Sequence, residues 1–206
     1  MKWVVIGAHL LRDDIDTPAE PIAAGDLFLS GLPIPDEQPL GDRDLLLRVA
    51  RVRAALLDRA TFIAVRYGFA INTHEEAAAK CSPHLARWRE NLERHRLEVE
   101  MTLKVVAAER VEPPHRRDFT SGGDYLKALH AATKAVQVDP KFREDAERLL
   151  ANGRWQHRDN QSLELAALVA RESVEKVKYE AIALKERFPH VPFLLSGPWP
   201  LEVFGE

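Results

Sequence analysis

The sequence has little cysteine and no large excess of charge of either sign. Cys81 is the only cysteine in 206 residues, so no intrachain disulfide can form and nothing indicates an oxidising compartment. Lysine and arginine number 29 against 32 aspartate and glutamate residues, a formal net charge of −3. Because binding to phosphate backbones needs a basic surface, this balance argues against nucleic acid as the main partner.

Long apolar runs are also absent. The longest stretch without aspartate, glutamate, lysine or arginine is residues 188–201, which holds 14 residues and four prolines. A membrane-spanning helix needs about 20 mostly apolar residues, so we expect no membrane segment. The apolar stretch before Gly7 is too short for a secretory signal. Hydrophobic residues make up 46% of the chain, enough for a packed core, and we expect a cytoplasmic protein.

Hydrophobic periodicity predicts a mixture of helices and strands. Leu45, Val49, Val52 and Leu56 recur at helical spacing, which predicts a helix over residues 42–59. Further helices are expected over 73–92 (with a kink or restart near Pro83), from 121 to about 136, over 140–150 and over 173–188. Strands are expected over 2–11, 23–29, 62–67, 97–106, 163–170 and 191–196, with a polar loop over 154–161.

This order of elements predicts an α+β fold with two small α/β domains. We place the first domain over residues 1–110 and the second over residues 111–206, because a polar segment with two adjacent prolines lies near their junction. The second domain includes a C-terminal tail over residues 197–206 that contains prolines and a tryptophan.

Two groups of residues could carry metal binding or nucleophilic catalysis. His74, Cys81 and His84 are close in sequence, but a structural zinc site needs about four ligands and no second pair has a suitable spacing. Cys81, with His95 also near, lies on the apolar stripe of a predicted helix, where a thiol acts as a small hydrophobic side chain. We therefore expect no metal, no cofactor and no nucleophile here.

Phosphate binding and acid–base catalysis have equally weak candidates. Residues 121–124, Ser-Gly-Gly-Asp, open a predicted helix, where anions can bind, yet they match no phosphate-binding motif, and a helix cap is the simpler interpretation. Glu98 and Glu100 share one face of a predicted strand, and the simpler interpretation is a solvated face.

The C-terminal tail is the most unusual segment. Two prolines flank Trp199 in the run Gly197-Pro198-Trp199-Pro200, and each fixes its backbone φ angle. The indole is thereby held in a defined direction. Two interpretations follow: Trp199 closes the core as a plug, or it is a preformed aromatic anchor for a protein partner.

Four segments, in order along the chain, resemble the GvpL/GvpF family of gas vesicle proteins. Residues 194–204, LLSGPWPLEVF, resemble the closing motif of the family. Residues 63–68 (IAVRYG), 99–105 (VEMTLKV) and 121–126 (SGGDYL) resemble three further family motifs. Ala64, Met101-Thr102 and Leu201-Glu202-Val203 depart from the family pattern.

The resemblance implies two compact α+β domains, the first ferredoxin-like, and no enzymatic activity. It also implies a role in gas vesicle formation through binding of the small hydrophobic shell protein and of other accessory proteins. Transferred by motif, the candidate interaction residues are Arg66, Gly68, Gly197, Pro198 and Trp199.

One alternative function stays open at the level of sequence. A ferredoxin-like scaffold hosts many functions, including small-molecule binding and catalysis on an unknown substrate. A deep polar pocket with converging titratable groups would favour this alternative, whereas a flat or grooved apolar surface would favour an assembly protein.

Overall fold

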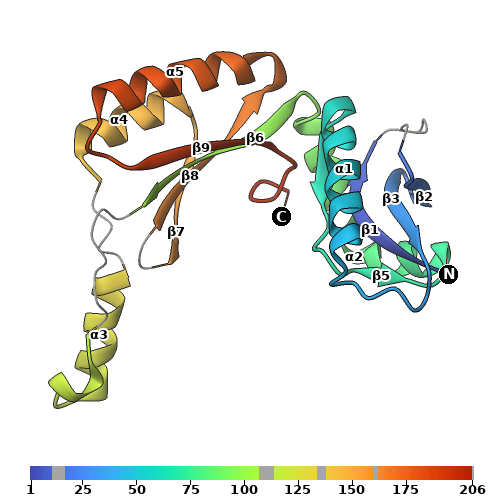
Figure 1. The fold of residues 1–206 in the computed structure, drawn as a ribbon, viewed down its shortest axis with the longest axis horizontal. Helices are drawn as coiled ribbons and strands as arrows, with labels where there is room; N and C mark the ends of the chain where they lie inside the picture. The colour runs from blue at the N-terminus through green and yellow to red at the C-terminus, as the bar shows by residue number, and fades with distance from the viewer. Residues whose placement is uncertain (11–16, 107–113, 134–137, 160–161, 206) are drawn as a thin grey trace. The chain divides into compact units, whose positions relative to one another are not determined.

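The structure is a computed structural model of all 206 residues, which describes residues 1–10, 17–106, 114–133, 138–159 and 162–205. Its contacts divide the chain into two compact units (Figure 1). Unit 1 comprises residues 1–99 and 198–206, and unit 2 comprises residues 100–197. The division differs from the predicted one in two respects, because the boundary falls near residue 100 and residues 198–206 belong to the first unit.

Each unit contains one sheet and its helices. Unit 1 is built from β1 (Lys2–His9), β2 (Glu20–Ala24), β3 (Leu27–Ile34), α1 (Arg43–Arg59), β4 (Phe62–Ala64), β5 (Ala70–Ile71) and α2 (His74–Arg94). Unit 2 is built from most of β6 (Glu98–Val106), η1 (Arg116–Asp118), α3 (Gly122–Thr133), α4 (Pro140–Leu149), β7 (Arg154–Asp159), β8 (Ser162–Ala170), η2 (Arg171–Ser173), α5 (Val174–Arg187) and most of β9 (Phe193–Trp199). The mixed α/β class with antiparallel strand pairs confirms the predicted class.

The sheet of unit 1 has the order β2-β3-β1-β4, and β5 pairs with β1. Successive side chains of β1 point to opposite faces, so Val4 packs in the same cluster as Val52 of α1. Val5 packs instead in the cluster that contains Ala77 and Cys81 of α2. The two helices therefore cover opposite faces of the sheet, and the predicted apolar stripe of α1 is buried against one of them.

A β-hairpin replaces the single strand that we predicted over residues 23–29. Strands β2 and β3 are antiparallel, and Ala24 pairs with Leu27, so Gly25 and Asp26 form a two-residue turn. Gly25 has a φ of 62°, as such turns require. The sequence pattern missed the turn because the segment is apolar on both sides of it.

Helix α2 runs without interruption from His74 to Arg94, and Pro83 lies inside it. At its start, Thr73 Oγ1 accepts a hydrogen bond from the Glu76 backbone N–H at 3.1 Å, and Glu76 Oε2 accepts one from the Asn72 backbone N–H at 2.7 Å. The predicted restart at Pro83 was wrong. The part of the chain that the structure describes has no helix long and apolar enough to cross a membrane.

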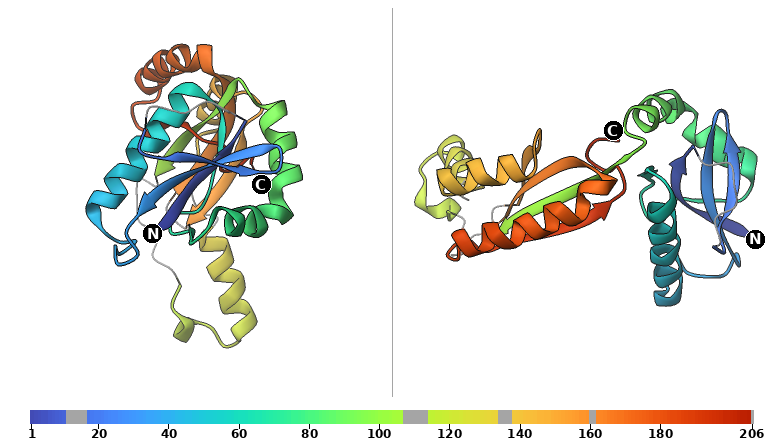
Figure 2. Two further views of the ribbon diagram at one scale, coloured as in Figure 1. Left: turned by 90° about the vertical axis from the view of Figure 1, so that its right-hand side faces the viewer. Right: turned by 90° about the horizontal axis from the view of Figure 1, so that it is seen from above.

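In unit 2, helices α3 and α4 lie between β6 and β7, and α5 lies between β8 and β9. Its sheet order is β7-β8-β6-β9. Figures 1 and 2 show α4 and α5 side by side over the sheet, where the Phe142 ring lies 5.4 Å from the Phe188 ring and 5.3 Å from the Phe193 ring. In unit 1, three strands precede the first helix. The ferredoxin-like topology expected for the first domain stays a prediction.

Three local predictions in the second half of the chain were wrong. The expected polar loop over 154–161 contains strand β7, which pairs with β8 in antiparallel register. Glu100 of β6 is 2% exposed, so it does not lie on a solvated strand face. We also expected a buried line on the helix that begins near residue 121, formed by Tyr125 or Leu126, Leu129, Thr133 and Val136. Val136 lies outside the described residues, and none of the side chains of α3 that the structure describes is buried.

Candidate functional site

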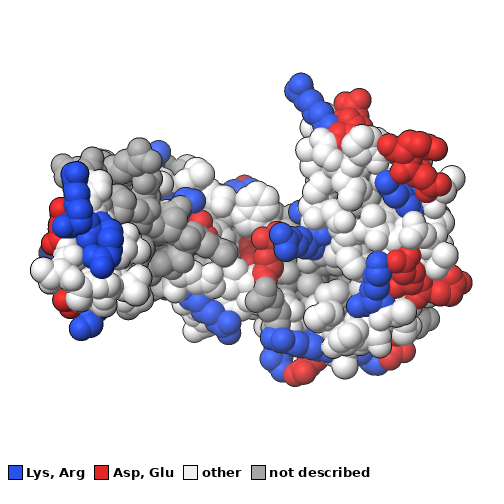
Figure 3. Space-filling view, turned by 90° about the horizontal axis from the view of Figure 1, so that it is seen from below, with Lys and Arg blue, Asp and Glu red and all other residues white. Residues whose placement is uncertain are grey.

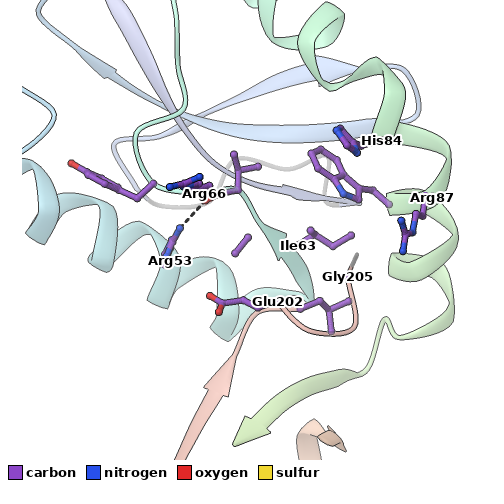
Figure 4. A pocket seen from close by; sticks show the side chains of 12 residues that line it. Arg53, Ile63, Arg66, His84, Arg87, Glu202 and Gly205 are labelled. Carbon is purple, nitrogen blue, oxygen red and sulfur yellow. Dashed lines mark hydrogen bonds between the residues drawn. The ribbon is translucent and has the colours of Figure 1, made fainter. Parts of the chain in front are cut away.

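A pocket of about 650 Å³ lies within unit 1, and four separate segments build it (Figure 4). Helix α1 contributes Arg53, and β4 with the turn after it contributes residues 63–67. Helix α2 contributes His84, Arg87 and Trp88, and the C-terminal tail contributes Leu201, Glu202 and Gly205. The pocket thus brings together Arg66, which the motif nominated, and the tail.

The pocket is rich in cationic side chains. Arg53, Arg66 and Arg87 line it, and among the described lining residues Glu202 is the one with a carboxylate. Figure 4 places Arg53 and Arg66 on one side and Arg87 on the other, with Ile63 between them. Within the described residues, the side chain of neither Arg66 nor Arg87 makes an ion pair or a hydrogen bond. Two charged guanidinium groups are therefore available to a ligand.

Arg53 is held in place by the backbone of the same pocket. Its Nη2 atom donates a hydrogen bond to the Val65 carbonyl oxygen at 2.9 Å. Its Nε atom is buried and has no hydrogen-bond partner among the residues that the structure describes. A buried donor without a partner carries a desolvation cost.

Arg66 and Gly68 lie in the turn that follows β4. The Phe69 backbone N–H donates to the Arg66 carbonyl oxygen at 3.3 Å, and Gly68 has a φ of 94°. An added Cβ at Gly68 would meet no atom within 4 Å, so its backbone angle is what favours glycine there. The turn directs Arg66 outward, where its side chain is exposed.

The tail packs into unit 1 through Leu201, which is 0% exposed. Its backbone N–H donates to the Phe62 carbonyl oxygen at 2.9 Å, and it forms a parallel bridge with Ile63. The Asn91 side chain donates to the Gly205 carbonyl oxygen at 3.3 Å. Trp199 is 46% exposed, so the plug expected at Trp199 is provided by Leu201 instead.

Gly197 and Pro198 do not line the pocket. Gly197 lies in β9 with a φ of 122°, and a Cβ there would stand 2.7 Å from Met101 Sδ and 2.9 Å from the Glu100 carbonyl oxygen. Pro198 follows within the same strand and is half-buried. Both residues shape the backbone that leads to the tail. This packing role needs the structure, because the sequence motif does not indicate which strand β9 approaches.

The alternative chemical sites have ordinary structural explanations. Cys81 is buried in the core of unit 1, and this burial raises the pKa of its thiol. His74 Nε2 lies 3.2 Å from Glu20 Oε1, whereas the His84 ring stacks on Trp88 with centroids 5.4 Å apart. In the described ranges of the chain, no group of three or more His, Cys, Asp or Glu side chains is placed to hold a metal ion.

The Ser-Gly-Gly-Asp segment is a helix cap. Ser121 Oγ accepts a hydrogen bond from the Asp124 backbone N–H at 3.0 Å, so one free donor at the start of α3 is satisfied internally. On the face drawn in Figure 3, basic and acidic side chains are interspersed. A mixture of this kind offers no extended basic surface on that face.

Comparison with protein-family models identifies one family. The model of the gas vesicle synthesis protein GvpL/GvpF family matches residues 11–201. The match covers three of the four motif segments in full and the closing motif as far as Leu201. No curated protein matches the chain.

Two solved structures have the same fold. The crystal structure of GvpF from Microcystis aeruginosa aligns with a TM-score of 0.70 at 12% identity, covering 100% of this chain and 99% of that one. GvpF from Anabaena sp. PCC7120 aligns with a TM-score of 0.67 at 11% identity, covering 100% and 98%. At this identity the likeness establishes the fold, and the family match establishes the relationship.

Proposed function

Because this chain belongs to the gas vesicle synthesis protein GvpL/GvpF family, we propose that it is an assembly protein that binds the small hydrophobic shell protein during gas vesicle formation. The family match over residues 11–201 is the observation that carries the proposal. The role requires no catalysis and no cofactor. We place the protein in the cytoplasm, in association with the growing vesicle, with other accessory proteins as further partners.

The physical task of such a protein is to cover apolar surface. A very hydrophobic shell protein released free would aggregate through its apolar faces and strand edges. A binder that covers those surfaces would hold the shell protein until it joins the vesicle. Apolar contact suits this task, because a net charge of −3 gives little long-range electrostatic steering.

Helix α5 offers an apolar face for this contact. Tyr179 and Ile182 are 75% and 59% exposed, and Ala183 beside them is exposed as well. Their spacing of three and four residues places them on one side of the helix, whereas Val177 and Leu184 are buried on the other. We propose that this outward face contributes to shell-protein binding.

The motif residues take different parts in this proposal. Arg66 is a binding residue of the pocket, and Trp199 presents its exposed ring as an aromatic anchor to a partner. Gly68, Gly197 and Pro198 set the backbone that positions these side chains.

Replacing Tyr179 and Ile182 together by serine is expected to weaken retention of the shell protein about tenfold or more, because the change removes two large apolar contacts. The measurement is retention of shell protein on the immobilised variant. A matched control replaces Glu175 and Lys185, which are exposed on the same helix, by serine and keeps the net charge. Equal retention by both variants would remove α5 from the proposal.

A second candidate function is small-molecule binding, and the pocket is the observation that favours it. Its volume of about 650 Å³ lies in the range of small-molecule sites, roughly 300–1,000 Å³. The pocket therefore needs a ligand assignment of its own.

A further inference from the structure

We propose that the pocket of unit 1 binds a carboxylate-bearing peptide segment of a partner protein, with acidic side chains on Arg66 and Arg87 and an apolar side chain between them. This site is distinct from the apolar face of α5. The inference does not depend on which protein supplies the segment.

The charges of the pocket select an anion. Three arginines line it, and among the described residues Arg66 and Arg87 have no carboxylate partner. Both side chains are exposed. The guanidinium group presents parallel N–H donors that match the two oxygens of a carboxylate, and such charge-assisted hydrogen bonds are roughly twice as strong as neutral ones.

The placement of the charges favours an elongated ligand. Arg66 and Arg87 come from different segments and lie on opposite sides of the pocket, and Ile63 occupies the space between them (Figure 4). Trp88 adds an aromatic wall beside the stacked ring of His84. A peptide with an acidic residue on each side of an apolar one matches this order of charged, apolar and charged groups.

A compact phosphate fits the same pocket less well. Phosphate sites commonly use backbone N–H groups of a glycine-rich loop or of a helix N-terminus. Here His84, Arg87 and Trp88 lie in the interior of α2, and Arg53 lies in the interior of α1. Arg66 and Arg87, whose side chains have no carboxylate partner among the described residues, lie on opposite sides of the pocket, where a single phosphate would not join them.

The test is a titration of the full-length protein with two capped hexapeptides. The first peptide contains a pair of adjacent leucines with one glutamate before the pair and one after it. In the second peptide, glutamine replaces both glutamates. The readout is the NMR signal of the Trp88 indole N–H. The chain has four tryptophans and therefore four such signals, and the one that disappears in the Trp88→Phe variant belongs to Trp88. The glutamate peptide is expected to shift the Trp88 signal, with binding that weakens as salt is added.

Replacing both Arg66 and Arg87 by glutamine is expected to weaken binding of the glutamate peptide about tenfold or more, because two charge-assisted contacts are lost. The control replaces Arg51 and Arg94 by glutamine, which removes the same charge at exposed positions that do not line the pocket. This control is expected to keep the affinity within about twofold.

Three results would overturn the assignment: an equal shift with the glutamine peptide, an equal loss of affinity in the control variant, or binding of inorganic phosphate as tight as that of the glutamate peptide. The last would identify a compact-anion site. None of these results bears on shell-protein binding through α5, because that contact is apolar and is measured without the peptides.

Discussion

Replacing Leu201 by alanine is expected to lower the free energy of unfolding by about 2–5 kcal/mol. Leu201 is 0% exposed, and its backbone is tied to β4 through Phe62 and Ile63. The substitution removes apolar atoms from a packed site and leaves a cavity at the point where the tail enters unit 1. Urea denaturation of the two proteins measures the difference.

Trp199→Ala serves as the comparison. Tryptophan is the larger residue, yet its side chain is 46% exposed, so its truncation is expected to cost less than about 2 kcal/mol. A larger loss of stability for Trp199→Ala than for Leu201→Ala would show that the indole, rather than Leu201, fixes the tail.

Replacing Gly197 by alanine is expected to destabilise unit 2 through two separate effects. A φ of 122° strains any residue with a Cβ, at a cost of about 1–3 kcal/mol. The new Cβ would also stand 2.7 Å from Met101 Sδ and 2.9 Å from the Glu100 carbonyl oxygen, and overpacking typically costs a further 1–3 kcal/mol or so. The midpoint of urea denaturation measures the sum.

Two other glycines separate these effects. Gly68 has a φ of 94° and no atom within 4 Å of an added Cβ, so Gly68→Ala is expected to show strain without overpacking. Gly41 has neither feature, and Gly41→Ala is expected to be close to neutral. The account fails if all three substitutions change stability by the same amount.

The helices were predictable where one face is clearly apolar. The spacing of Leu45, Val49, Val52 and Leu56 placed α1 within one residue of its observed start. All four side chains are buried against the sheet, so the apolar residues recur in the sequence with the period of a helix. Strand β7 was missed because its residues are mostly polar and its existence depends on pairing with β8, a tertiary interaction that leaves little local pattern.

The pocket could be predicted only in part. The family motif nominated Arg66, which lines it. Arg53, Arg87 and Trp88 carry no motif, and nothing in their spacing connects them. They meet because α1 and α2 cover opposite faces of the sheet while the tail returns to β4. Sequence periodicity indicates which side of a helix is buried, but it does not indicate which exposed residues of two helices face each other.

The tail illustrates the same limit. The flanking prolines predicted a segment of fixed direction over residues 197–200, but they could not identify the residue that is buried. Pro200 and Leu201 are buried, whereas Trp199 is exposed. The hydrogen bond between the Leu201 N–H and the Phe62 carbonyl oxygen decides this, and it joins residues that are far apart in sequence.

Retention of the gas vesicle shell protein on this protein, at low and at high salt, tests the central claim most directly. Ionic contacts between exposed groups are screened over about 8–10 Å near physiological ionic strength, whereas apolar contact is not weakened by screening. The account predicts retention of the shell protein at both salt concentrations and no retention of an unrelated apolar protein. Absence of retention at either salt concentration, or equal retention of the unrelated protein, would contradict it.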